Sequence, residues 1–251
     1  MDQNNNFEKM NGSDISLTEK SKVLSWLDNF WYHHKWKVII IAFFTVFLIV
    51  GIVQMANKTE ADITVTVATH TIFYKENVDA LDKDLTALMP HDRNGDGKKI
   101  INLKPYKIYS ESEMKEANEA ETDADGNPVI YADEAYNKEQ IKQFNSFIGM
   151  GECSVMILSE YMYEDILARR TDVSLLISMK EIYGDQLPAD AMEYGIRLRD
   201  TGAYDYFASL STIPDDAVIC IMRPFVLGNK DAEQRNQFAI DYFKSIVSFG
   251  K

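Results

Sequence analysis

The sequence predicts an α/β fold, in which a mixed, partly parallel sheet with flanking helices follows a single transmembrane helix near the N-terminus. Three observations support it. Residues 38–56 contain no charged side chain, and about 195 residues follow them, enough for one sizeable core. Along those residues, segments with the two-residue period of strands alternate with segments of helical period. This alternation is typical of sheets that contain parallel neighbours.

Residues 38–56 form the predicted transmembrane helix. Thirteen of these nineteen residues are Val, Ile, Leu or Phe, and at 1.5 Å per residue the run spans roughly 28 Å, about the thickness of a hydrocarbon core. A cleaved secretory signal is the alternative, but its apolar region has only about 7 to 15 residues after a short basic leader. Here 37 residues precede a longer run. The sequence therefore favours a retained anchor.

The residues around this run predict its orientation. Lys35 and Lys37 precede it, whereas Lys58 follows it together with acidic residues, so the N-terminal side is the more basic and is expected in the cytoplasm. Amphipathic aromatic rings prefer the headgroup region. All three tryptophans lie just before the run, at Trp26, Trp31 and Trp36. We expect a single-pass protein of the cell membrane, with these residues at the inner interface and residues 57–251 as an extracytoplasmic domain.

The segment before the anchor divides into two parts. Residues 1–15 are polar and predicted to be a disordered cytoplasmic tail. Ser16 and Glu19 have the spacing of a capping box, and apolar residues then recur at helical spacing, so residues 16–37 are predicted to form a juxtamembrane amphipathic helix. A cytoplasmic helix that binds a partner protein remains the alternative.

The charge of the chain lies almost wholly beyond the anchor. Residues 1–56 hold five basic and five acidic side chains, so the formal charge of −13 comes from 21 basic and 34 acidic residues in the outer region. Nucleic acid is therefore excluded as a partner, because phosphates would be repelled. The acidic surface either attracts cationic ligands or simply keeps the domain soluble.

The outer elements follow from their periods. Residues 62–68 alternate β-branched and polar side chains, which predicts a strand, and residues 75–89 place leucines at helical spacing. The same criteria predict a strand at 100–109, a helix at 134–148, a strand at 153–158, a helix at 161–168, strands at 194–199 and 217–222 joined by an aromatic-bearing loop, and a C-terminal helix at 231–249. The acidic residues 111–130 are predicted to form a long surface excursion.

A resemblance accompanies this order of elements. The glycine-containing turn after residue 148, the strand Ser154-Val-Met-Ile-Leu-Ser159 and the helix Glu160-Tyr-Met-Tyr-Glu-Asp-Ile-Leu167 resemble the first lobe of extracellular solute-binding proteins of the periplasmic-binding type. Residues 175–188 are similar to the segment that crosses to the second lobe. The His-Lys-Trp-Lys run before the span also resembles small membrane-tethered proteins of Gram-positive bacteria. The resemblance implies a ligand-binding scaffold, although no cysteine for lipidation lies near the span.

Open α/β sheets bind ligands at the carboxyl ends of their strands. The residues that follow the first and third outer strands are therefore the candidate ligand-binding residues, with ordinary loop residues as the alternative. They are Thr69, His70, Tyr74, Ser159, Glu160 and Tyr161.

A calcium-loop pattern begins at residue 92. Asp92, Asn94 and Asp96 supply oxygen at positions one, three and five, and Gly97 occupies the sixth position. Position twelve is Leu103 instead of Glu, so a calcium site there would be weak. A solvated turn is the alternative, because such turns need Asn, Asp and Gly regardless of metal.

Other chemistry is weakly represented. Cys153 and Cys220 each lie in an apolar run and are predicted to be buried, and whether they pair is left open. The sequence carries no nucleophile elbow, zinc-binding His-Glu-x-x-His or phosphate loop. It therefore favours a non-enzymatic, membrane-tethered domain that binds or senses a small molecule or peptide. An accessory subunit that docks on another membrane protein, such as a transporter, is the alternative, and a surface hydrolase is less favoured.

Overall fold

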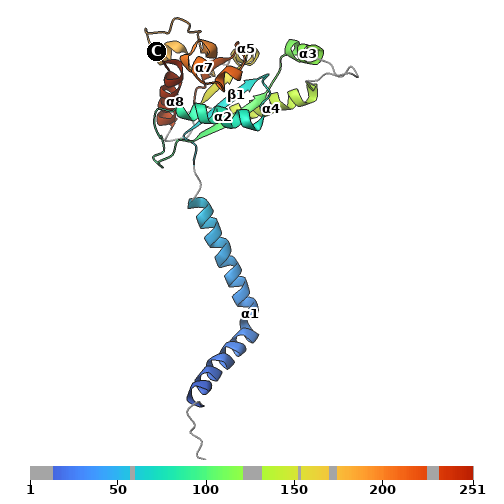
Figure 1. Ribbon diagram of the computed structural model, residues 1–251, viewed down its shortest axis with the longest axis vertical. Coiled ribbons are helices and arrows are strands. Elements are labelled where there is room, and N and C mark those ends of the chain that lie inside the picture. Colours follow the sequence, from blue (N-terminus) through green and yellow to red (C-terminus); the bar gives the residue numbers. More distant parts are fainter. Residues whose placement is uncertain are drawn as a thin grey trace, which may run out of the picture. The chain divides into compact units, whose positions relative to one another are not determined.

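The structure, a computed structural model, describes residues 14–56, 60–120, 132–151, 154–169, 174–224 and 232–250. The chain forms two compact units, Met1–Thr59 and Glu60–Lys251. The first contains helix α1 (Asp14–Ala56), and the second contains the strands found among the described residues (Figure 1).

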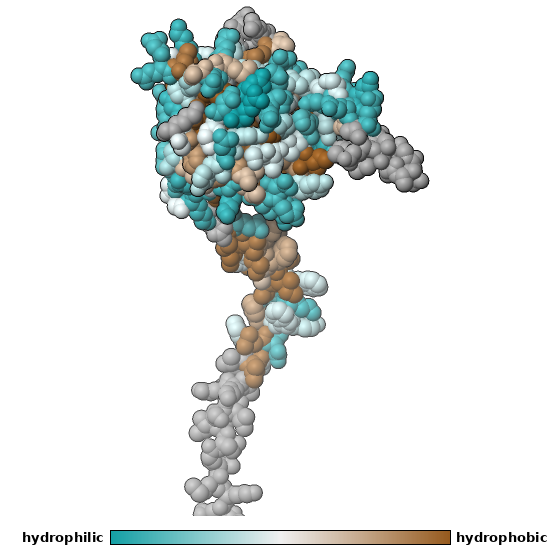
Figure 2. All heavy atoms as spheres, turned by 45° about the horizontal axis from the view of Figure 1, so that its top comes forward, coloured by the Kyte–Doolittle hydropathy of each residue, from teal (hydrophilic) through white to brown (hydrophobic). Residues whose placement is uncertain are grey.

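Helix α1 contains one apolar stretch, Leu24–Gln54, that is long and apolar enough to cross a membrane, and its side chains are not buried in the protein. This stretch is consistent with a membrane anchor or a signal sequence. One helix runs through both residues 16–37 and residues 38–56, and neither proline nor glycine interrupts it before Gly51. Figure 2 shows mainly hydrophobic side chains, with a few hydrophilic ones, along the coloured part of this helix, and mainly hydrophilic side chains on the visible face of the second unit.

The second unit is built on a mixed five-stranded sheet of order β2-β1-β3-β5-β4. Its central strand β1 (Ile63–Thr69) is parallel to both β2 (Ile101–Lys107) and β3 (Val155–Leu158). Strand β5 (Val218–Ile221) is antiparallel to β3, and the two-residue strand β4 (Ile196–Arg197) is antiparallel to β5. The predicted α/β fold with a partly parallel sheet and flanking helices is confirmed.

Two hydrophobic cores cover the two faces of this sheet. On one face, strand residues such as Val65 and Ile157 belong to the same cluster as residues of α2 (Lys75–Ala87) and α8 (Ala232–Val247). On the other face, residues such as Met156 pack with α4 (Glu134–Gly149) and α5 (Glu160–Ala168). Successive residues of β3 belong alternately to the two clusters, because successive side chains of a strand point to opposite faces.

Cys220 lies in the second of these clusters and is buried, as predicted. Cys153 lies outside the described residues, so its pairing with Cys220 remains untested.

The excursion predicted at residues 111–130 begins as a helix. Residues 111–120 form helix α3 (Glu111–Ala120), and residues 121–131 lie outside the described residues. The polarity of the segment predicted an excursion at the surface but did not predict this helix, whose cap is described below.

The region between the last two strands also contains more structure than an aromatic-bearing loop. It holds α7 (Gly202–Tyr206), flanked by the short 3₁₀ turns Leu198–Asp200 and Leu210–Thr212. The segment likened to a lobe crossing contains α6 (Met179–Tyr183) and stays on the same unit, where Ile177 donates its amide to the Ile221 carbonyl at 2.9 Å.

Candidate functional site

The carboxyl ends of the three parallel strands meet at one edge of the sheet. The register pairs Thr69 of β1 with Lys107 of β2, and Ala68 of β1 with Leu158 of β3. The segments that leave β1, β2 and β3 therefore start side by side. This is the edge at which open α/β sheets bind ligands.

Two of the candidate ligand residues stabilise the fold at this edge. Thr69 and Ser159 are both fully buried. The Thr69 hydroxyl accepts a hydrogen bond from the Thr71 amide at 3.3 Å, and the Ser159 hydroxyl caps α5 by accepting from the Met162 amide at 3.4 Å. Buried hydroxyl groups need such partners, and neither residue lines a described pocket.

Glu160 links the end of β3 to residues of the antiparallel part of the sheet through hydrogen bonds. Its carboxylate accepts from Arg197 Nη2 at 2.6 Å, and its amide donates to Asp216 Oδ2 at 3.0 Å. Tyr74 is 63% exposed before α2 and lines no described pocket. The structure therefore does not bring Tyr74 and Glu160 into the pocket described next, whereas it does bring Tyr161 there.

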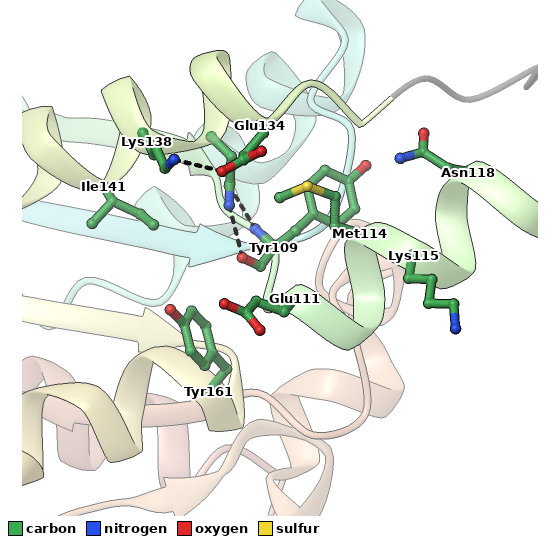
Figure 3. Close-up of a pocket in the computed structure, with 10 residues that line it drawn as sticks. Tyr109, Glu111, Met114, Lys115, Asn118, Glu134, Lys138, Ile141 and Tyr161 are labelled. Atoms are coloured by element: carbon green, nitrogen blue, oxygen red, sulfur yellow. Dashed lines mark hydrogen bonds and ion pairs between the residues drawn. The ribbon is translucent and has the colours of Figure 1, made fainter.

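A pocket of about 530 Å³ opens at this edge (Figure 3). Side chains from the end of β2 and from helices α3, α4 and α5 surround it. The lining residues are Tyr109, Glu111, Met114, Lys115, Asn118, Glu134, Asn137, Lys138, Ile141 and Tyr161.

Asn137 holds the two sides of this pocket together. It is 6% exposed, and its side chain accepts from the Tyr109 amide and donates to the Tyr109 carbonyl, both at 2.9 Å. This pair of hydrogen bonds joins the backbone that follows β2 to α4, and Figure 3 draws both bonds as dashed lines at Tyr109. Asn137 thereby fixes the backbone from which the Tyr109 ring projects.

Helix α3 is attached to the sheet edge through Glu113. The Ser110 hydroxyl accepts from the Glu113 amide at 3.2 Å, and Glu113 Oε2 accepts from the Ser110 amide at 2.6 Å, which together form a capping box. Glu113 Oε1 lies 2.7 Å from His70 Nδ1. The His70 ring also stacks on Tyr109, with ring centroids 6.2 Å apart. One carboxylate therefore caps α3 and binds it to the end of β1.

The His70–Glu113 contact shifts the pKa values of both partners. The hydrogen bond to Glu113 raises the pKa of His70 above 6.5, against the opposing effect of burial, and Glu113, Asp216 and Glu116 add attraction for the proton. For Glu113, burial favours the neutral acid, but the bonds from His70 and Ser110 outweigh it and lower the pKa to about 2. The pair is therefore charged under mildly acidic conditions.

A second hollow of about 550 Å³ is also lined by Tyr109, and His70 lines this one instead of the first. Tyr204 and Asp215 both line this hollow, and the Tyr204 hydroxyl donates to Asp215 Oδ1 at 2.8 Å. Burial, followed by this bond, raises the pKa of Tyr204 to about 12. A third hollow, of about 580 Å³, lies beside α6 and is lined by Met192 among others.

The side-chain oxygens of the calcium-loop pattern accept hydrogen bonds from backbone amides of the same turn. Asp92 accepts from Gly95 and Gly97 at 2.8 and 2.7 Å. Burial opposes ionisation of Asp92, but these amides outweigh it and lower its pKa. Asn94 Oδ1 accepts from the Asp96 amide at 2.9 Å, and Asp96 Oδ1 accepts from the Lys98 amide at 2.8 Å. The geometry is that of a turn stabilised by its own side chains, and weak calcium binding remains a prediction.

Two important features of the site were not predicted from the sequence. Asn137 carried no signal, because its partners lie 28 positions away in the chain. Helix α3 did carry one, since Ser110-Glu-Ser-Glu113 has the spacing of a capping box. The same criterion that marks Ser16 and Glu19 would have predicted α3.

We expect the attachment of α3 to depend on pH. The raised pKa of His70 adds stability below 6.5 that is lost as pH rises through the folded-state value, and the lowered pKa of Glu113 adds stability above 4.5 that is lost as pH falls towards 2. Hydrogen exchange of the α3 amides should therefore be slowest between about pH 4.5 and 6.5, after correction for intrinsic rates. The pair is partly exposed, so we expect an effect of about 1 kcal/mol.

The matched control for this prediction is His91→Gln, because the ring of His91 packs against Phe238 of α8 and not against α3. His70→Gln should remove the loss of protection of α3 above about pH 6.5, whereas His91→Gln should leave the profile unchanged. The same profile in wild type and His70→Gln would contradict the assignment.

Comparison with known proteins finds no matching family model, no matching curated protein and no matching solved structure.

Proposed function

We propose that this chain is a single-pass membrane protein with a cytoplasmic N-terminus, whose outer domain binds a small molecule at the carboxyl edge of its sheet. The anchor proposal rests on α1, in which the apolar stretch of 31 residues is longer than the apolar region of a signal peptide. The tryptophans and lysines just before residue 38 support the orientation.

The observation that carries the binding function is the pocket of about 530 Å³, defined by side chains from four elements. Its volume lies within the range of small-molecule sites, and it combines aromatic, apolar and a few polar groups, as such sites do. Among its lining residues none is Ser, Thr, Cys or His. A hydroxyl or thiol nucleophile activated by a histidine is therefore not among them, and this favours binding over hydrolysis by that mechanism.

The test is a melting-temperature screen of the full chain in lipid nanodiscs. The panel should span neutral, zwitterionic, anionic and cationic small molecules. A compound at 100 times its dissociation constant should stabilise the domain by about 2.7 kcal/mol. Ile141→Trp should fill the pocket and abolish the shift, whereas Met192→Trp, in the hollow beside α6, should leave it. The proposal fails if no compound shifts the melting temperature, or if Met192→Trp alone removes the shift.

A docking subunit is the second candidate function, and an exposed aromatic cluster favours it. Tyr206 is 71% exposed, and its ring lies 4.8 Å from that of Phe207 and 5.0 Å from that of Phe249, centroid to centroid. Exposed aromatic residues are common anchors of protein interfaces. If the ligand screen fails, crosslinking from position 206 to another membrane protein in intact cells would support this function.

A further inference from the structure

One carboxylate that lines the carboxyl-edge pocket, that of Glu111, forms no ion pair within the described part of the chain. Glu134 is paired with Lys138 at 2.5 Å. Lys115 lies 4.0 Å from Glu119 and, in Figure 3, points away from the other lining residues. No ion pair is formed by Glu111 with any described residue. The local field of the pocket is therefore negative at Glu111.

Aromatic and apolar groups surround this carboxylate. The side chain of Glu111 points towards Tyr161, which extends into the pocket from the start of α5 (Figure 3). Tyr109, Met114 and Ile141 complete the apolar part of the lining. Aromatic faces attract cations through their quadrupole, and a neighbouring carboxylate adds a direct charge.

We propose, on the basis of the proposed binding function, that this pocket binds an organic ammonium ion with an apolar body. The ammonium group binds between the Glu111 carboxylate and the Tyr161 ring, and the apolar body contacts Met114 and Ile141. Tyr161 and Glu111 thus recognise the cation, while the opposite wall provides hydrophobic contact.

Two other ligand classes fit the pocket less well. A bare divalent cation takes six to eight oxygen ligands when it is calcium, and Glu111 is the one lining carboxylate without a cationic partner among the described residues. An anion would meet Glu111 inside the pocket and, outside it, a domain with 34 acidic and 21 basic residues.

The test compares three probes that share a benzyl group and differ in charge: 2-phenylethylammonium, 2-phenylethanol and phenylacetate. Titration calorimetry on the full chain in nanodiscs should show that the ammonium ion binds at least about fivefold more tightly than the alcohol, since an exposed cation contact contributes about 1 kcal/mol. Phenylacetate should bind more weakly than the alcohol.

Variants connect this preference to the pocket. Glu111→Gln should remove the preference for the ammonium ion, and Glu233→Gln on α8, a carboxylate that does not line the pocket, should retain it. Tyr161→Leu should weaken ammonium binding about threefold, whereas Tyr161→Phe, which keeps the aromatic face, should restore it.

The outcomes separate the two proposals. Tighter binding of the alcohol or the acid, with a shift that Ile141→Trp abolishes, overturns the ammonium inference and leaves the binding function intact. Ammonium preference that survives Glu111→Gln also overturns the inference. Failure of every probe and every panel compound overturns both.

Discussion

Asp62→Ala should lower the free energy of unfolding of the second unit, Glu60–Lys251, by about 3 kcal/mol, because it leaves three backbone amides without their acceptor. Asp62 is 4% exposed at the start of β1. Its Oδ1 accepts from the amides of Arg93 and Asn94 at 2.9 and 3.1 Å, and its Oδ2 accepts from the Ile100 amide at 2.9 Å. This one carboxylate therefore holds the calcium-like turn against the strand that begins the sheet.

The measurement is urea unfolding of the full chain in nanodiscs, followed by the near-ultraviolet circular dichroism of tyrosine. Tryptophan fluorescence would report on the wrong unit, because all three tryptophans lie in α1. The control is Asp96→Ala in the same turn, an exposed residue whose carboxylate accepts from one amide and should cost less than about 1 kcal/mol. Equal costs for Asp62→Ala and Asp96→Ala would contradict the role of Asp62.

Asn137→Ala should destabilise the domain by about 2 to 3 kcal/mol and also weaken ligand binding. The substitution removes both hydrogen bonds to the Tyr109 backbone in a buried setting, and unsatisfied buried groups cost about 1 to 3 kcal/mol each. Because Tyr109 lines both hollows of the carboxyl edge, its displacement should change the pocket as well.

The control for Asn137→Ala is Gln143→Ala on the same helix. Gln143 is exposed and contacts Glu139 within α4, so its loss should change stability by less than about 0.5 kcal/mol. If Asn137→Ala leaves both the unfolding midpoint and ligand affinity at their wild-type values, Asn137 does not organise the site.

The roles of Asp62 and Asn137 could not be predicted from the sequence. Strands β1 and β3 and helices α2, α4 and α8 were predictable, because their apolar residues repeat with the period of the element. Asp62 and Asn137 read as ordinary polar residues, since their partners lie 28 to 38 positions away. Only the folded chain shows that each satisfies buried backbone groups.

Only some of the candidate ligand residues line the hollows at the carboxyl edge. The rule that ligands bind at the carboxyl ends of strands led to His70 and Tyr161, which line adjacent hollows there. It also led to Thr69 and Ser159, because the rule ranks residues by position along the strand and cannot tell a buried cap from an exposed ligand group. Helix α3, which provides one wall, required the capping box to be recognised.

The most direct test of the central claim, that the carboxyl edge holds a ligand site, is methyl NMR of the full chain in nanodiscs, labelled at methionine and isoleucine. The panel compound that gives the largest melting shift should perturb the methyl signals of Met114 and Ile141 in wild type and should leave Met192, beside α6, unchanged. Perturbation confined to Met192, or to methyl groups of α1, would contradict the account.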